Sequence, residues 1–111
     1  VGRSGRKSEK RLTRMLGGRG RPASGALVGA KGDIALEQFL MEAKSSTRES
    51  MTLKLDWLCK IAREARSEGK KAALTISFVT EDGRARLDGD WVLLPLHVFE
   101  ELLTDGEDAV R

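Results

Sequence analysis

The sequence predicts an α/β protein, a small mixed β-sheet flanked by helices. Apolar residues recur at helical spacing in two segments, whereas several shorter runs have the length and the apolar character of strands. These segments follow one another in the order α-β-β-β-α-β-β-α, which is typical of a sheet covered by helices. A chain of 111 residues is most simply a single domain with one core, spanning 1–111.

The first helix is expected at residues 4–16, where leucine and methionine supply the apolar positions. The pair Gly17-Gly18 ends it, because glycine adopts the backbone of a helix terminus without strain. A glycine-rich connection then covers 17–32, and we expect a short strand within it at 26–29. This part of the chain therefore contributes one helix and one strand.

A hairpin is expected next, formed by strands at residues 33–36 and 39–45. Polar Glu37 and Gln38 separate the two apolar runs and favour a tight turn between antiparallel partners. Side chains of each strand then alternate between the two faces of the sheet.

The second half is expected to begin with the clearest helix, at residues 52–68, with Thr52 as its cap and Gly69 as its stop signal. The continuous apolar run that follows is typical of a strand buried on both faces. After a turn, a further strand and a short helix precede an acidic tail that we expect to fray. These last elements are predicted at residues 72–79, 90–95, 96–103 and 104–111.

The composition is that of a folded globular protein, with 40% apolar and 33% charged residues. No apolar run approaches the roughly 20 residues that span a bilayer, and the basic N-terminus lacks the apolar segment of a secretory signal. The single cysteine, Cys59, has no partner for an internal disulfide. We therefore expect a cytoplasmic protein without a membrane partner.

Charge is distributed unevenly along the chain. Residues 1–32 contain nine Lys and Arg residues and one acid, a net charge of +8, whereas the remainder carries −5. A segment with this density of positive charge is what a polyphosphate backbone attracts. A solvated basic tail without a partner is the alternative that charge alone leaves open.

The predicted hairpin carries charged residues that a short apolar hairpin does not need. Strand alternation puts Glu42 and Lys44 side by side on one face, and pairing of the two strands would bring Asp33 close to them. Two carboxylates converging beside a lysine form a ready site for Mg²⁺, a hard cation that prefers oxygen ligands. An exposed Glu–Lys pair on a solvated strand is the alternative, because this triplet is common.

Two further charges lie on the apolar faces of predicted helices. Glu9 shares a face with Leu12 and Leu16, and a carboxylate buried alone is costly, so it needs a partner. Lys54 lies in the apolar sector of the second helix, where it could reach past the sheet edge toward the acids, and we count it as a candidate catalytic residue. Snorkelling to water is the alternative for either side chain.

Together these residues resemble the PD-(D/E)XK nuclease motif. The aspartate of "GDI" is followed nine residues later by "EAK", although Gly32 stands where the motif often has proline. Glu9 in a preceding helix, the loop "RPASG", the strand "FLMEAKSS" and the long helix after it are similar to archaeal-type Holliday junction resolvases and their phage relatives. The resemblance covers about residues 6–79 and implies a restriction-endonuclease-like core.

What the resemblance implies is a Mg²⁺-dependent endonuclease in which Mn²⁺ is expected to substitute. Asp33, Glu42 and the backbone carbonyl of Ala43 would hold the ion. Glu9 would support the metal shell or a second metal, and Lys44 would position the attacking water. A phage-encoded enzyme of this kind would act in the cytoplasm of its host.

The expected substrate is branched double-stranded DNA, above all the four-way junction. Ser24 matches a loop serine that would lie near the scissile strand, and the basic segment would grip the phosphates. A four-way junction is two-fold symmetric and one chain has one site, so we expect a homodimer with an interface formed by Trp91, Leu94 and Phe99. The residues expected to contact DNA are Arg3, Arg6, Lys7, Lys10, Arg14, Arg19, Arg21 and Lys31.

Two other functions remain open on the sequence. The same core would serve nicking, replication-associated and restriction-type endonucleases. A non-catalytic DNA- or RNA-binding module could also keep the fold, although a binder gains nothing from acids clustered near phosphates.

Overall fold

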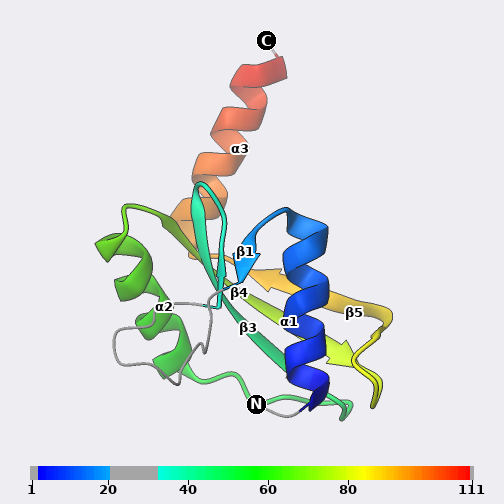
Figure 1. Cartoon of the computed structure of the whole chain (residues 1–111). Helices are drawn as coiled ribbons and strands as arrows, with labels where there is room; N and C mark the ends of the chain where they lie inside the picture. The colour runs from blue at the N-terminus through cyan, green and yellow to red at the C-terminus, as the bar shows by residue number, and fades with distance from the viewer. Residues whose placement is uncertain (1–2, 21–32, 111) are drawn as a thin grey trace.

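The computed structural model describes residues 3–20 and 33–110 of the chain, and it is an α/β fold (Figure 1). The predicted class, a mixed sheet flanked by helices, is confirmed. No helix within the described ranges has the length and apolar character needed to cross a bilayer. The elements are α1 (Arg3–Leu16), β1 (Arg19–Gly20), β2 (Ile34–Ala35), β3 (Phe39–Ser46), α2 (Leu55–Ser67), β4 (Lys71–Val79), β5 (Ala85–Leu93) and α3 (Leu96–Val110).

The strands form one sheet in which neighbours in space are also neighbours in the sequence, from β1 at one edge to β5 at the other. β3 and β4 run parallel, and the other pairs are antiparallel. Parallel neighbours need a crossover connection, which α2 supplies. The predicted hairpin is present, with Ile34 paired to Met41 and Ala35 to Leu40.

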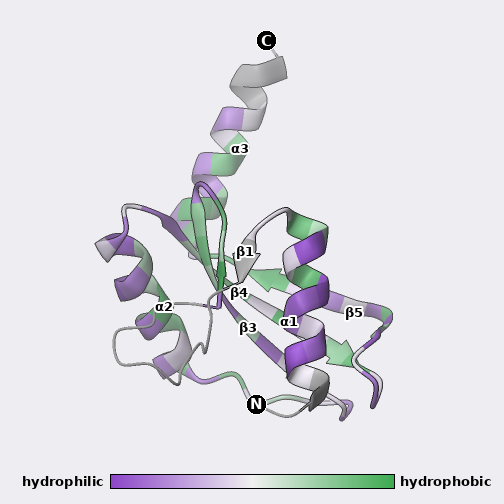
Figure 2. Cartoon of the chain, in the orientation of Figure 1, coloured by the Kyte–Doolittle hydropathy of each residue, from purple (hydrophilic) through white to green (hydrophobic). Residues whose placement is uncertain are grey.

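Helices α1 and α2 cover opposite faces of this sheet. Leu12 of α1 packs in a buried cluster with Met41 of β3, whereas Leu40 of β3 packs in a second cluster with Ile61 of α2. Leu40 and Met41 are consecutive in a strand, so their side chains point to opposite faces. Figure 2 shows hydrophilic residues along both helices, as expected for elements that cover a core on one side only.

The start of α2 differs from the prediction. The helix begins at Leu55 and not at Thr52, and its first backbone bond runs from the N–H of Trp57 to the carbonyl of Lys54. No side chain caps this end, and Leu53 is exposed, so neither a cap nor apolar packing extends the helix further back. Lys54 is therefore an extended residue in front of the helix, outside the apolar sector in which the sequence placed it.

Other boundaries follow local geometry. Gly17 and Gly69 end α1 and α2 with φ angles of 70° and 68°, as predicted. β5 begins earlier than expected, at Ala85, and α3 continues to Val110, past the point where fraying was predicted. The strand expected at 26–29 lies outside the described residues.

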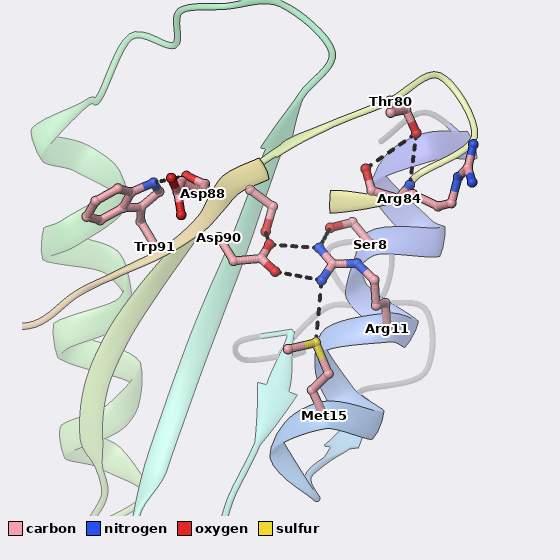
Figure 3. A network of polar contacts seen from close by, with 9 residues as sticks. Ser8, Arg11, Met15, Thr80, Arg84, Asp88, Asp90 and Trp91 are labelled. Atoms are coloured by element: carbon pink, nitrogen blue, oxygen red, sulfur yellow. Dashed lines mark hydrogen bonds and ion pairs between the residues drawn. The ribbon is translucent and has the colours of Figure 1, made fainter. Parts of the chain in front are cut away.

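An ion pair ties α1 to β5, the strand at the edge of the sheet. Arg11 donates two hydrogen bonds to the carboxylate of Asp90 in β5, of 2.7 and 2.8 Å, and Ser77 of β4 donates a third (Figure 3). In α1, Leu12 is buried but Met15 is 64% exposed, so apolar packing of this helix is limited. The bidentate pair is therefore a substantial part of what positions α1.

We predict that Asp90→Asn lowers the free energy of unfolding by about 1 kcal/mol at pH 7, allowing for solvent screening of this partly exposed pair. The hydrogen bond from Arg11, then that from Ser77, lowers the pKa of Asp90. The stabilisation is thus present above the unfolded pKa and is lost as the pH falls through the folded value. Urea unfolding at pH 7 and at acid pH measures it, with the exposed Asp88→Asn as control. A loss that is equal at both pH values would contradict this role.

Candidate active site

Asp33 is held against β3 by two hydrogen bonds. Its N–H donates to the carbonyl of Met41, and its carboxylate Oδ2 accepts the N–H of Ala43, both at 2.8 Å. The paired register of β2 and β3 ends at Ile34 and Met41, and Asp33 comes directly before it, where its charge is close enough to raise the pKa of Glu42. The structure thus brings the two carboxylates together by the strand pairing that the sequence suggested.

Lys44 lies beside Glu42 and beneath α2. Its Nζ is 3.6 Å from Oε2 of Glu42 and 4.5 Å from the centre of the Trp57 ring, so a cation–π contact fixes the ammonium from the helix side. The Glu42 and Lys44 side chains are 13% and 30% exposed. This sheltered pair is therefore different from the solvated Glu–Lys pair that remained the alternative.

Glu9 lies within electrostatic reach of the same acids. Burial, followed by the charges of Asp33 and Glu42, raises the pKa of Glu9 from 4.5 to about 7. Burial, followed by the charge of Asp33, likewise raises the pKa of Glu42, against the opposing effect of Lys60 and Lys44. Three carboxylates, from α1, from the residue before β2 and from β3, thus share one electrostatic environment.

The chemistry of these residues suits a hard cation. Within residues 3–20 and 33–110, no three His, Cys, Asp or Glu side chains come close enough together to hold a metal ion. Mg²⁺, however, commonly binds through one or two carboxylates and keeps several waters, and Asp33 with Glu42 offers such a pair. Burial, and after it the charge of Asp33, raises the pKa of Glu42, and a bound cation would favour the charged carboxylate against both effects.

Two residues of α2 that the sequence analysis missed belong to this environment. Lys60 lies 3.9 Å from Glu64, and the charges of both act on the pKa of Glu42. They continue the stripe that begins at Trp57, at the spacing of successive helix turns. That spacing is visible in the sequence, but the neighbouring stripe is more apolar, so the sequence alone did not indicate that these two residues lie near Glu42. The predicted Lys54 is instead exposed in front of α2.

The remaining predicted residues divide by position. Arg6, Lys7, Lys10 and Arg14 are exposed on α1, on the same helix as Glu9. Arg3 and Arg19 belong to α1 and β1, and their side chains are outside the described part. The others that fall outside the described residues are Arg21, Ser24 and Lys31.

No family model matches the chain, and no curated protein or solved structure matches it either. What the site can do follows from its own residues. Carboxylates able to hold a hard cation, with a sheltered lysine beside them, suit hydrolysis of a phosphodiester, a reaction in which positioning and charge neutralisation do most of the catalysis.

We predict that Glu9→Gln makes the fold more stable at pH 8 in the presence of EDTA. Folding raises the pKa of Glu9 to about 7, so the stability present below pH 4.5 is lost as the pH rises through 7. Glutamine keeps the size of the side chain and removes this cost. With allowance for solvent screening of a partly exposed group, the gain is about 1 kcal/mol.

Urea unfolding at pH 4 and pH 8 checks this effect. The difference between Glu9→Gln and the unsubstituted protein should be near zero at pH 4 and clear at pH 8. Glu37→Gln, in the exposed turn of the hairpin, should show no such change. A destabilised Glu9→Gln at pH 8 would mean that Glu9 has a structural partner instead.

Proposed function

We propose that this chain is a Mg²⁺-dependent, structure-selective endodeoxyribonuclease of the PD-(D/E)XK type that resolves four-way DNA junctions. The observation that carries the proposal is the position of Asp33, bonded to the N–H of Ala43 and acting electrostatically on Glu42, with the Lys44 ammonium 3.6 Å from Glu42. Carboxylates repel phosphate, so a cluster of them is a burden to a module that only binds DNA or RNA. It is useful where a cation and a water must be held at a phosphodiester.

Each residue of the cluster has a proposed role. Asp33, Glu42 and the carbonyl of Ala43 would hold Mg²⁺ or Mn²⁺, and the ion supplies charge neutralisation at the scissile phosphate. Lys44 would orient the attacking water in line with the leaving oxygen. Glu9 would support the same carboxylates from α1, consistent with its electrostatic coupling to them.

The substrate class follows from the surface around the cluster. The exposed cations of α1 would contact phosphates on either side of the scissile bond. Such contacts position a protein on DNA without reading its sequence, which suits an enzyme that selects branched shape. A two-fold symmetric junction would be cut by two copies acting together. The cations concerned are Arg6, Lys7, Lys10 and Arg14.

We predict that the protein cleaves a labelled four-way junction with Mg²⁺ and that EDTA abolishes the reaction. Asp33→Asn, Glu42→Gln and Lys44→Met should each lower the cleavage rate by about 10²-fold or more, as removal of a group that stabilises the transition state does. Gel-shift affinity in EDTA should be kept or slightly tightened in the two acid variants, because less negative charge faces the phosphates.

The controls separate the possible functions. Glu37→Gln changes a carboxylate in the turn of the same hairpin and should cleave normally. Normal cleavage by Glu42→Gln would overturn the site assignment. Equal rates on junction, flap and linear duplex of matched sequence would favour a nicking or restriction-type enzyme. Tight binding without any cleavage, and without a Mg²⁺-dependent rise in melting temperature, would favour a binding module.

A comparison of two lysines tests the geometry of α2. We predict that Lys60→Met lowers the cleavage rate about tenfold, because Lys60 acts on Glu42, and that Lys54→Met has a smaller effect because Lys54 is an extended residue in front of the helix. Lys60→Arg should restore most of the rate by keeping the charge. Single-turnover rates on the junction measure these differences. A larger loss for Lys54→Met would support the role that the sequence first suggested for Lys54.

A further inference from the structure

Helix α3 projects from the body of the protein (Figure 1). It exposes a stripe of apolar side chains. Leu96, Phe99 and Leu103 are 74%, 49% and 52% exposed. Their spacing of three and four residues puts them on one side of the helix. Val98, in the first turn, is buried, so α3 is attached at its base while this stripe stays uncovered.

An apolar groove opens at the base of α3. It has a volume of about 270 Å³ and lies between α2, β4 and the segment that leads from β5 into α3. Pro95 lines the groove, and α3 begins at the next residue. The helix therefore starts at the groove of its own chain and extends out of it. The main lining residues are Leu58, Cys59, Ala62, Leu74, Leu93 and Pro95.

Charge indicates which surface can cover the stripe. Between residues 96 and 110 the chain has several acids and no lysine or arginine, so two α3 helices packed together would place like charges side by side. On α2, by contrast, exposed Arg63 and Arg66 follow the groove-lining Ala62 within about one turn. Arg66, one helix turn after Ala62, is thus on the same side of α2 as the groove lining and could pair with the acids of an entering α3.

We propose that α3 of one copy packs its Leu96–Phe99–Leu103 stripe into the groove of a second copy, and that the second copy does the same in return. This reciprocal exchange closes a two-fold symmetric dimer and covers both exposed apolar surfaces in one step. It stands independently of nuclease activity. Of the interface expected from the sequence, it keeps Phe99 and leaves Trp91 at the sheet edge.

Cys59 provides a direct test, because it is exposed, lines the groove and is the only cysteine of the chain. Phe99→Cys and Leu103→Cys are prepared in turn and oxidised mildly as full-length protein at micromolar concentration. At least one of them should form a covalent dimer on a non-reducing gel through Cys59 of one copy and position 99 or 103 of the other. The same variants with Cys59→Ser should remain unlinked.

Each other result overturns the exchange. A covalent dimer that persists with Cys59→Ser would show α3 packed against α3. A link formed within one chain would show that α3 folds back onto its own groove. The absence of any link from both positions would show that the groove and the stripe do not meet.

The mass in solution gives a second measurement on unlinked protein. Light scattering should find about twice 12.2 kDa for the unsubstituted chain, and Phe99→Asp or Arg66→Glu should raise the dimer dissociation constant about tenfold or more. Leu87→Asp changes an apolar side chain that is 95% exposed on β5, and it should leave the mass unchanged. Circular dichroism verifies that each variant is folded. A monomeric unsubstituted chain at tens of micromolar would overturn the proposal.

Discussion

The position of Asp33 relative to Glu42 depends on the register between two very short strands. β2 has two residues, yet the N–H and the carboxylate of Asp33 both bond to the backbone of β3, and Ile34 beside it is completely buried. A slip of one residue would turn Ile34 out of its cluster with Leu12 and Met41 and onto the face of the sheet that carries Glu42. Burial of one apolar side chain therefore fixes the geometry on which the proposed chemistry depends.

The same geometry brings carboxylates close together, and positive charges elsewhere in the fold offset their repulsion. The raised pKa values of Glu9 and Glu42 show that folding buries these acids, and secondarily brings them near other carboxylates, at a cost. Lys44 and Lys60 reduce that cost at Glu42. At Glu9 the repulsion acts on a helix with little apolar packing, and the Arg11–Asp90 pair holds α1 in place against it.

What the sequence could predict was local. A period of two residues was enough to place Glu42 and Lys44 on one face of β3, and glycine was enough to end two helices. The groups that sequence reasoning missed are placed by long-range contacts. Arg11 and Asp90 are 79 residues apart, and the role of Lys60 depends on how the α2 crossover lies on β3. Lys54 was misplaced for the same reason, since only packing decides where an uncapped helix begins.

Two sides of helix α2 contribute residues to two different surfaces of the protein. Trp57 contacts Lys44 and Lys60 acts on Glu42, whereas Leu58, Cys59 and Ala62 line the apolar groove. Consecutive residues of a helix point about 100° apart, so Trp57 and Leu58 belong to different surfaces although they are adjacent in sequence. Substitutions on one side leave the contacts of the other intact. The proposed catalysis and the proposed self-association can therefore be tested separately, and neither measurement depends on the outcome of the other.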